Sequence, residues 1–529
     1  MFSRISIILL CFPALLMSGN PPFRFVEVAR DAGLDYEHGY QAGLRINEFK
    51  MMAGGAAVGD YNGDGWIDLY VIRGDIGPNL LFRNNGDGTF AEVGAQAGVA
   101  IEGEYGCGPS FMDCDGDGYL DLLIGGVENT PPRFFRNKGD GTFEDISAQS
   151  GIIIDGNTFS TGYGDYDRDG DVDMFLTHWT GYPSANNGHL WRNEGDGTFT
   201  NVDVQAGIIG YDELDFSFTP NFTDINNDGW PDILVAGDFN TSQYYINNGD
   251  GTFEFHKPPV LSDENGMGSA IADYDNDGDF DWFVSSVYNP TGERSGPGGM
   301  TGFTGNRLYQ NQGDGTFEDV TDQAGVRIGY WGWGSSFADL NNDGHLDLAH
   351  TNGFMVPGFF EDPTRIFMSN GQGGFEERSL ELGVSDNAQG RGLVTFDYDR
   401  DGDLDILITN NSGRPLLYRN EGANAANWLN VKLTGIGANI LALGSRVSVT
   451  ANGMTQIREV RCNNNYTAHQ PAEVHFGLGG AELIDELKIT WPDGHETVLK
   501  DVAPNRFLNI KYSKRPTNER NARIGKPDM

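Results

Sequence analysis

The sequence is short of cysteine, of basic residues and of long hydrophobic runs. It holds 4 Cys among 529 residues, and 35 Lys and Arg against 76 Asp and Glu, so its formal net charge is −41. The folded part shows no basic stripe of the kind that binds nucleic acid. After residue 17 no apolar run approaches the about 20 residues of a membrane-spanning helix. We therefore expect neither a nucleic-acid partner nor a transmembrane span.

The cysteines do not suggest a disulfide framework. If Cys107 and Cys114 share one strand, they lie about 23 Å apart, whereas a disulfide needs Cα atoms within about 7 Å. We expect Cys107, Cys114 and Cys462 to be free, buried thiols. Catalytic signatures are missing too, because there is no nucleophile elbow, zinc-protease helix motif or phosphate-binding loop. We name no catalytic residue, and an enzyme is the less favoured interpretation.

The N-terminus has the features of an export signal. Arg4 precedes an apolar run from Ile5 to Met17, and the small residues Ser18 and Gly19 follow. We expect residues 1–19 to be removed, and the protein to be secreted, periplasmic or at the cell surface.

What the sequence has in abundance is an acidic pattern, D-x-D/N-x-D-G-x-x-D, which occurs seven times and runs each time into an apolar strand. Oxygens at alternate positions of such a loop suit calcium, a hard cation with about six to eight oxygen ligands. The sixth position is always Gly, where the loop must turn sharply. We expect up to seven structural calcium ions, with ligands at positions one, three, five and nine: Asp60, Asn62, Asp64 and Asp68; Asp113, Asp115, Asp117 and Asp121; Asp165, Asp167, Asp169 and Asp173; Asp224, Asn226, Asp228 and Asp232; Asp273, Asp275, Asp277 and Asp281; Asp339, Asn341, Asp343 and Asp347; Asp397, Asp399, Asp401 and Asp405.

These loops differ from EF-hands. An EF-hand needs a bidentate Glu at position twelve and a helix on each side, whereas position twelve here holds residues such as Val71 and Ile124. Runs such as Leu122–Ile124 are short and rich in strand-forming residues, so we expect buried strands after each loop. The pattern therefore indicates a loop that ties strands together.

The loops recur every 49 to 66 residues, a period typical of propeller blades or a solenoid. A second mark, N-x-G-D-G-T-F, follows in five repeats, first at Asn84–Phe90, and is typical of a hairpin turn. The last repeat breaks off after Gly422, but residues 25–34 match the outer-strand segment at 317–326. Closure from both ends favours a seven-bladed β-propeller over an open solenoid.

The repeats resemble the FG-GAP or VCBS repeat, the calcium-loop blade of integrin α-chain propellers. Residues 427–512 resemble the ASPIC/UnbV domain through Trp428–Leu433, Gly444–Val447, His475–Gly479 and Ile489–Gly494. The order of parts is similar to that of the cartilage acidic protein family and its bacterial relatives. One departure is Asn463–Tyr466, where a Gly-rich approach to the Tyr is expected. The resemblance implies an exported calcium-binding propeller linked to adhesion or matrix contact, with no established reaction.

We expect an all-β chain of four parts: a signal peptide at 1–19, the propeller at 20–424, a small β-sandwich at 425–513 and a basic tail at 514–529. Three insertions lengthen the same connection of the repeat, at 178–189, 288–307 and 351–364. Insertions at one position of a repeat map to one face of the ring. The candidate ligand contacts are His178, Trp179, Tyr182, His189, Phe354, Phe359 and Phe360. The alternatives are that these residues pack the loops onto the rim, or that His178 and His189 hold a transition metal.

The favoured hypothesis is an exported calcium-binding propeller that binds a glycan, a matrix protein or a surface protein. One alternative is an extracytoplasmic enzyme, such as a sugar lyase or dehydratase, with its site at the mouth of the propeller channel. Another is a structural subunit of an exported complex. In the C-terminal domain, Tyr466, His469, Gln470 and His475 either bind a ligand or pack a loop.

Overall fold

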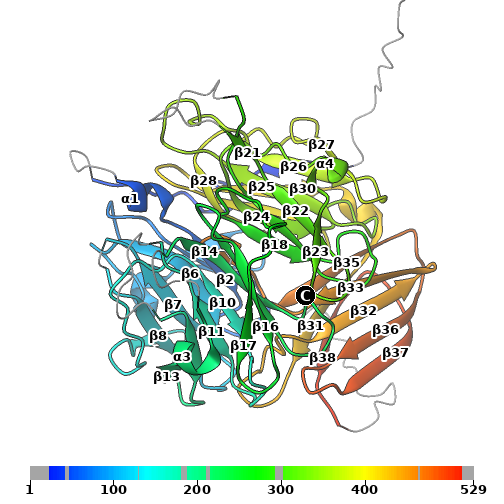
Figure 1. Cartoon of the computed structure of the whole chain (residues 1–529), viewed down its shortest axis with the longest axis horizontal. Coiled ribbons are helices and arrows are strands. Elements are labelled where there is room, and N and C mark those ends of the chain that lie inside the picture. The colour runs from blue at the N-terminus through cyan, green and yellow to red at the C-terminus, as the bar shows by residue number, and fades with distance from the viewer. Residues whose placement is uncertain are drawn as a thin grey trace, which may run out of the picture.

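The computed structural model describes residues 23–41, 47–128, 130–179, 188–209, 215–291, 302–462 and 465–514. The expected signal peptide and basic tail lie outside these residues, except for Lys514. Two bodies of β-sheet make up the molecule, a ring of blades coloured blue to yellow in Figure 1 and a smaller domain in orange to red at one side.

Seven sheets of four antiparallel strands form the ring in the described part of the chain. The first four are β2 (Ala56–Gly59), β3 (Asp68–Val71), β4 (Leu80–Asn84) and β5 (Phe90–Glu92); β6 (Gly106–Met112), β7 (Asp121–Gly126), β8 (Arg133–Asn137) and β9 (Phe143–Asp145); β10 (Thr161–Gly164), β11 (Asp173–Leu176), β12 (Leu190–Asn193) and β13 (Phe199–Asn201); β14 (Ser217–Thr223), β15 (Asp232–Gly237), β16 (Gln243–Asn247) and β17 (Phe253–His256).

The other three are β18 (Ser269–Ala272), β19 (Asp281–Val284), β22 (Arg307–Asn311) and β23 (Phe317–Asp319); β24 (Gly332–Ala338), β25 (Asp347–Asn352), β26 (Arg365–Ser369) and β27 (Phe375–Glu377); β28 (Gly390–Phe396), β29 (Asp405–Asn410), β30 (Leu416–Glu421) and β1 (Arg24–Glu27). Each acidic loop joins the first and second strands of its sheet. First strands of neighbouring sheets contact one another, as β10, β14, β18, β24 and β28 do in turn, so they form the inner wall of the ring. The all-β propeller that the sequence predicts is confirmed.

Both ends of the ring chain meet in the last blade. β1 pairs with β30 in antiparallel register, with Phe25 opposite Asn420, and supplies the fourth strand of that sheet. Phe23 and Phe25 are buried in the core of this blade. The chain closes the ring by hydrogen bonds between strands nearly 400 residues apart, so β30 is not left as the edge of a three-stranded sheet.

Short helical turns and one two-stranded sheet connect or flank the blades of the ring. Single helical turns α2 (Gly94–Ala97), α3 (Asp203–Ala206) and α4 (Thr321–Ala324) follow three outer strands, and each ends at a Gly in the left-handed region, such as Gly98 with φ of +84°. Helix α1 (Glu48–Met52) precedes the first blade, and β20 (Tyr288–Asn289) pairs with β21 (Phe303–Thr304). A 3₁₀ turn, η1 (Ala423–Ala425), leads to the second domain.

The C-terminal domain is a small β-sandwich. One sheet holds β35 (Glu473–Gly479), β31 (Asn427–Thr434) and β38 (Arg506–Lys511), and the other holds β33 (Met454–Glu459), β32 (Arg446–Ala451), β36 (Ile484–Thr490) and β37 (Glu496–Val502). Alternate residues such as Val447 and Val449 are fully buried between the sheets, which is the pattern of a strand with one face in the core. The predicted sandwich is therefore confirmed.

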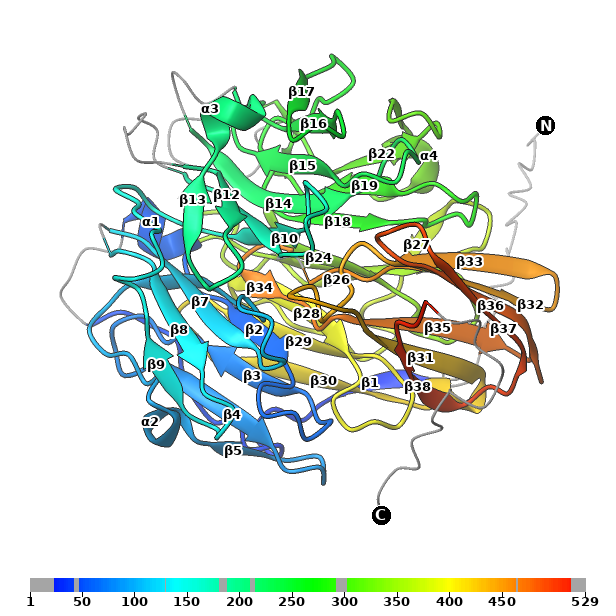
Figure 2. The same ribbon diagram turned by 90° about the horizontal axis from the view of Figure 1, so that it is seen from below.

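One segment of this domain leaves the sandwich and enters the propeller. Its strand β34 (Ala468–His469) pairs in parallel with β2 of the first blade, and Figure 2 shows it among the blades, apart from the other orange and red strands. Tyr466, Thr467 and Ala468 are fully buried. A Cβ at Gly55 would lie 1.9 Å from the carbonyl oxygen of Thr467, so only glycine permits this approach.

The inserted segment is held by several blades at once. The Tyr466 hydroxyl donates to the carbonyl oxygen of Met52 at 3.0 Å, and its ring packs 4.8 Å from that of Trp333 and 5.5 Å from that of Phe218, measured between centroids. The backbone N–H of Thr467 donates to Ser160 Oγ at 3.1 Å. These contacts join four blades around the propeller axis, so the segment acts as a central plug, which we define as residues 465–470.

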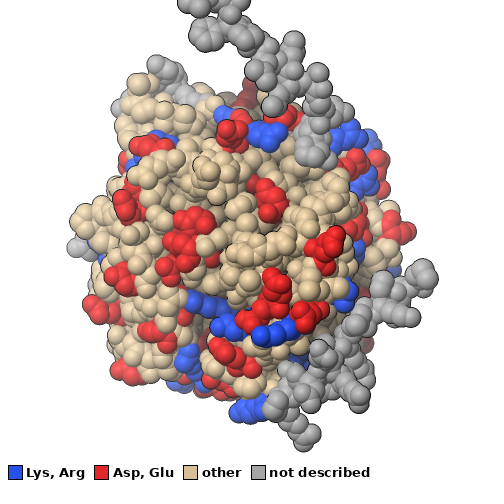
Figure 3. All heavy atoms as spheres, turned by 90° about the vertical axis from the view of Figure 1, so that its right-hand side faces the viewer, with Lys and Arg blue, Asp and Glu red and all other residues tan. Residues whose placement is uncertain are grey.

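The surface is strongly acidic, as the composition requires. On the side shown in Figure 3, acidic side chains are scattered over the face, and basic side chains gather in small groups beside them. Within the described residues, Cys107, Cys114 and Cys462 are free and buried.

We expect Phe25→Ala to destabilise the ring by about 3–5 kcal/mol, because it removes a buried aromatic side chain from the closing strand. Arg24→Ala is the matched control, since its exposed ion pair with Glu421 is worth under about 1 kcal/mol. Urea denaturation of both variants measures the difference. Equal, small losses would show that the closing strand contributes little.

We expect Tyr466→Ala to lower stability by about 3–5 kcal/mol, because it empties the buried space at the propeller axis. Tyr466→Phe keeps the ring and loses only the hydrogen bond to Met52, so about 1 kcal/mol is expected. Thermal unfolding of the two variants tests the plug, and an unchanged midpoint for Tyr466→Ala would contradict it.

Candidate calcium centres and the domain interface

In six of the seven acidic loops the first carboxylate accepts hydrogen bonds from the backbone of its own loop. In the first loop, Asp60 accepts hydrogen bonds from the backbone N–H groups of Asp64 and Gly65, both at 3.0 Å. The glycine at position six has φ between +88° and +104° in all seven loops, a region in which a side chain is strained. Position four is left-handed as well, even where it holds Arg168 or Arg400. This constraint was not recognised from the sequence, although Gly or Asn fills the other five copies.

The ninth-position carboxylate connects the acidic loop with two strands of its blade. In the second blade, Asp121 is 2% exposed and accepts from the N–H of Cys114 at 3.0 Å and from the N–H of Asn137 at 2.8 Å. The same pair of bonds recurs in all seven blades. The loop, the second strand and the third strand are thus held by one side chain.

The first residue of the N-x-G-D-G-T-F mark joins neighbouring blades. Asn137 donates from Nδ2 to the carbonyl oxygen of Leu120 in its own loop at 3.0 Å, and to that of Tyr61 in the preceding loop at 2.8 Å. Five other blades repeat this arrangement, and Asn84 completes the circle by donating to Tyr398 at 2.8 Å. In the sixth blade Ser369 takes this place. The motif therefore acts between blades as well as within its hairpin.

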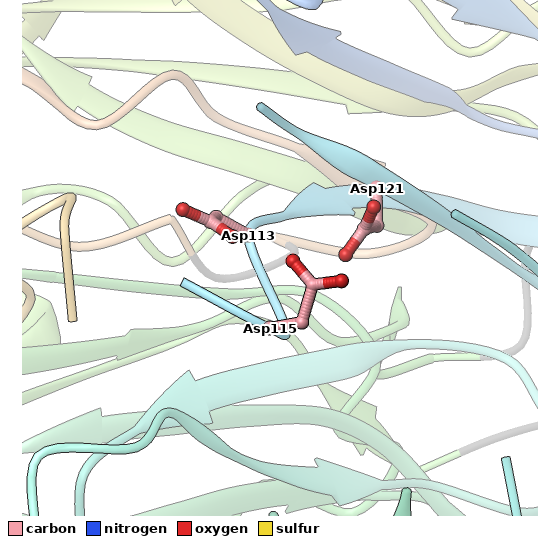
Figure 4. A group of neighbouring side chains, drawn as sticks. All are labelled: Asp113, Asp115 and Asp121. Carbon is pink, nitrogen blue, oxygen red and sulfur yellow. The ribbon is translucent and has the colours of Figure 1, made fainter. Parts of the chain in front are cut away.

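Four loops bring three carboxylates together. The groups are Asp113, Asp115 and Asp121; Asp165, Asp167 and Asp173; Asp273, Asp275 and Asp281; and Asp397, Asp399 and Asp405, with one oxygen of each residue within 4.8 Å of the others. Figure 4 shows the first group, in which Asp115 and Asp121 face one another beside Asp113. The other three loops carry Asn at position three, so they offer one carboxylate fewer.

The donor set fits a hard divalent cation. Both carboxylate oxygens of Asp273, which is 1% exposed, have no hydrogen-bond partner, and neither do single oxygens of Asp115, Asp165, Asp275 and Asp399. A buried ionised oxygen without a partner is costly. Burial accordingly raises the pKa of Asp273 to about 7 and that of Asp68 to about 8. A calcium ion would supply the missing positive charge, and the fifth-position Asp and a backbone carbonyl would complete the oxygen set.

The C-terminal domain lies on the loop side of the propeller, and charged contacts anchor it there. Lys432 Nζ is 3.5 Å from Asp60 Oδ2, and Arg446 Nη2 is 3.3 Å from Asp224 Oδ2. Arg400, in the last loop, forms a bidentate pair with Glu473 at 2.6 and 2.9 Å. Both sheets of the domain thus contact residues of the acidic loops.

Hydrogen bonds to carbonyl and amide oxygens extend the interface to the remaining blades. Asn439 donates its N–H to the carbonyl oxygen of Gly170 at 2.9 Å, Arg461 reaches that of Ile271 at 2.6 Å, and His475 Nε2 lies 2.7 Å from Asn342 Oδ1. Ala438 lies against Gly116 of the second loop. Together these contacts reach all seven blades, so the domain covers the loop face.

The candidate ligand contacts differ in how deeply they are buried. His178, His189, Phe354 and Phe359 are buried, in keeping with the alternative that they pack the inserted loops onto the ring. His178 has carbonyl oxygens at both ring nitrogens, 2.7 Å and 3.1 Å away, which leaves neither nitrogen for a metal. Trp179 is half-buried and Phe360 is 50% exposed. Tyr182 lies outside the described residues.

Tyr466, His469 and Gln470 belong to the plug, and His475 to the domain interface. The Tyr466 ring packs against Trp333 and Phe218.

Comparison with known families agrees with this architecture. The FG-GAP-like repeat family matches residues 60–124, 113–176, 224–284 and 298–350, and the ASPIC and UnbV family matches residues 435–517. The chain is an FG-GAP repeat protein with an ASPIC/UnbV domain. Its FG-GAP blades carry the acidic loops, and its ASPIC/UnbV domain supplies the cap and the plug.

The relatives found share the name cartilage acidic protein 1. The Mus musculus protein is 25% identical over 518 residues, which cover 87% of this chain and 73% of the relative. The Xenopus tropicalis protein is 28% identical and the Homo sapiens protein 28%, over 39% and 53% of this chain. Those two alignments span 41% and 42% of the relatives' own length, so the chain matches less than half of each.

Solved structures give more distant matches. A lectin of Agrocybe aegerita that recognises non-reducing terminal N-acetylglucosamine is 19% identical, with a TM-score of 0.38 over 61% of this chain and 79% of the lectin. Rhamnogalacturonan lyase YesW is 14% identical, with a TM-score of 0.39 over 75% of each chain. Both scores are below 0.5, and the architecture rests on the sheets of this chain itself. In the described residues no helix has the length and apolar character to cross a membrane.

We expect Asp277→Ala to reduce the rise in melting temperature that calcium produces, because this exposed fifth-position carboxylate would bind the ion and, within its described loop, accepts one hydrogen bond, from the N–H of Asp279. Asp121→Ala should lower the melting temperature also in EGTA, since it leaves two buried backbone N–H groups unpaired at about 1–3 kcal/mol each. Calorimetry of both variants, with millimolar calcium and with EGTA, separates the two roles. A wild-type melting temperature that is the same in both buffers would refute calcium coupling.

Proposed function

We propose that the protein is an exported FG-GAP propeller that binds a glycan through the face opposite its calcium loops, with calcium stiffening the blades. Matrix or surface proteins are the other partners that the sequence hypothesis includes. The observation that carries the proposal is an aromatic cluster of Trp179, Phe216, Phe239 and Phe49 on that face.

The position of the cluster follows from the strand order. Antiparallel strands alternate in direction, so connections after second strands lie opposite the acidic loops that follow first strands. Trp179 follows β11 and Phe239 follows β15, both second strands, while Phe49 and Phe216 precede first strands. The ASPIC/UnbV domain covers the loop face, so the aromatic face is the one available to a large ligand.

The cluster is firmly held and partly open. Phe216 lies 4.7 Å from Phe239 and 5.5 Å from Trp179, and Phe49 lies 5.7 Å from Trp179, between ring centroids. The indole N–H of Trp179 donates to Asp238 Oδ2 at 3.1 Å, which fixes the ring. Phe239 is 54% exposed. A rigid aromatic surface beside polar groups is suited to stacking against sugar rings, and adjoining exposed aromatics mark interaction sites.

We expect the mature protein to be captured by a defined polysaccharide on a glycan and matrix-protein array in millimolar calcium, with weaker capture in EDTA. Phe239→Ser should reduce capture by about tenfold, because a stacking ring at such a site is worth about 1–2 kcal/mol. Val204→Ser, which removes an equally apolar side chain that is 91% exposed on α3, is the matched control. Capture unaffected by Phe239→Ser would exclude this face, and capture only by proteins would favour the matrix interpretation.

A further inference from the structure

The seven loops fall into two groups by their charge and partners. Loops that begin at Asp113, Asp165, Asp273 and Asp397 hold four Asp at the ligand positions, while those that begin at Asp60, Asp224 and Asp339 hold three Asp and one Asn. The buried ligand-position oxygens without a hydrogen-bond partner, among the described residues, all belong to the first group.

Two of the three Asn-containing loops, the fourth and the sixth, hold a side-chain hydrogen bond between their third and fifth residues. Asn226 donates from Nδ2 to Asp228 Oδ2 at 2.9 Å, and Asn341 donates in the same way to Asp343 at 2.9 Å. In these two loops the third residue therefore stabilises the carboxylate of the fifth, and in all three Asn-containing loops it adds no second negative charge. An ion entering them meets a weaker attractive field, because attraction grows with the number of ionised ligands.

Two of these three loops also receive a cation from the ASPIC/UnbV domain, on the carboxylate that would bind the metal. Lys432, on β31, contacts Asp60 in the first loop, and its partner carboxylate is 7% exposed. Arg446, on β32, contacts Asp224 through both its carboxylate and its carbonyl oxygen, the latter at 2.6 Å. The third such loop contacts the domain through His475, which meets the neutral Asn342. The domain's Arg458 also acts on Asp339 of this loop, and on Asp273 of an all-Asp loop, through its charge, but it forms no ion pair with either among the described residues.

A basic side chain near a loop is not unusual by itself. Arg136 of β8 lies 3.0 Å from Asp115 in the second loop. That arginine belongs to the same blade and contacts the third position of a loop with four carboxylates. Lys432 and Arg446 differ in both respects, since they come from another domain and contact the first position of loops with three carboxylates.

We infer that Lys432 and Arg446 act as resident positive charges in the first and fourth loops. These two loops therefore bind calcium more weakly than the four all-Asp loops, and calcium competes there with the contacts of the docked ASPIC/UnbV domain. The inference rests on the proposed calcium binding. Coupling of this kind is reciprocal: calcium in these two loops weakens the domain contact by the same factor by which the contact weakens calcium. Calcium therefore weakens the contact between the domains only at concentrations above those that fill the all-Asp loops.

The sequence supplies a local reporter for the two loops. Position seven is Trp66 in the first loop and Trp230 in the fourth, and no other loop has Trp there. Terbium bound in either loop would be sensitised by the adjacent indole, and calcium would displace it. Trp428 also lies against a loop, at Gly402, and could sensitise terbium there. The variants Trp66→Phe and Trp230→Phe therefore identify the part of the terbium emission that comes from the first and fourth loops.

The test uses the full mature protein. Calcium titration by calorimetry should give a tight group of sites and a weaker group, and the Trp66- and Trp230-dependent terbium emission should be displaced only in the weaker range. Lys432→Met with Arg446→Met should raise calcium affinity in the weaker range by about fivefold or more and leave the tight group unchanged. Lys488→Met, which removes a cation paired with Glu496, is the control and should change neither.

The outcomes are distinct. Seven equivalent sites, or unchanged displacement in the double variant, would overturn the inference while leaving calcium binding intact. Absence of calcium binding at every loop would refute both the inference and the proposed calcium role, but not glycan capture. If the double variant unfolds, the two single Met variants and the melting temperature in EGTA provide the same comparison.

Discussion

The structure depends on buried carboxylates at the ends of short strands. Each ninth-position Asp holds a loop and two strands through backbone hydrogen bonds, and six Asn side chains join one blade to the next through backbone carbonyls. These bonds lie where a blade has little apolar area of its own, because its strands are only three to seven residues long. The cost is a set of buried negative charges, of which Asp273 is the clearest example. A ring stabilised in this way needs cations at its loops.

The same loops position the second domain. An acidic face that must be neutralised attracts basic side chains, and the ASPIC/UnbV domain provides Lys432 and Arg446 there. The plug then extends from this domain to the propeller axis, where glycines such as Gly55 leave room for it. The two domains are therefore joined by charge at the rim and by close packing at the centre. One face of the ring is covered, and the other remains available for recognition.

The two faces of the propeller ring have different roles in this architecture. Blade repeats make a rigid scaffold, and the lengthened connections place aromatic side chains on the side away from the cap. The cartilage acidic protein relatives carry a name that refers to acidity, and in this chain 25 of the acidic residues occupy ligand positions of the loops. Part of the negative charge is thus built into the scaffold.

The sequence by itself determined the blades, their loops and the closing strand, because each depends on residues at fixed spacing within one repeat. The position-nine Asp and the apolar residue that follows it (Leu, Ile, Met or Trp) predict a buried strand wherever they occur. Only the tertiary structure decided the rest. Burial of His178 and Phe359 depends on contacts with neighbouring segments of the ring. The cap on the loop face and the passage of Tyr466 to the propeller axis depend on contacts between residues hundreds of positions apart. No local pattern marks such contacts, because the free energy that selects them arises from packing two finished surfaces together.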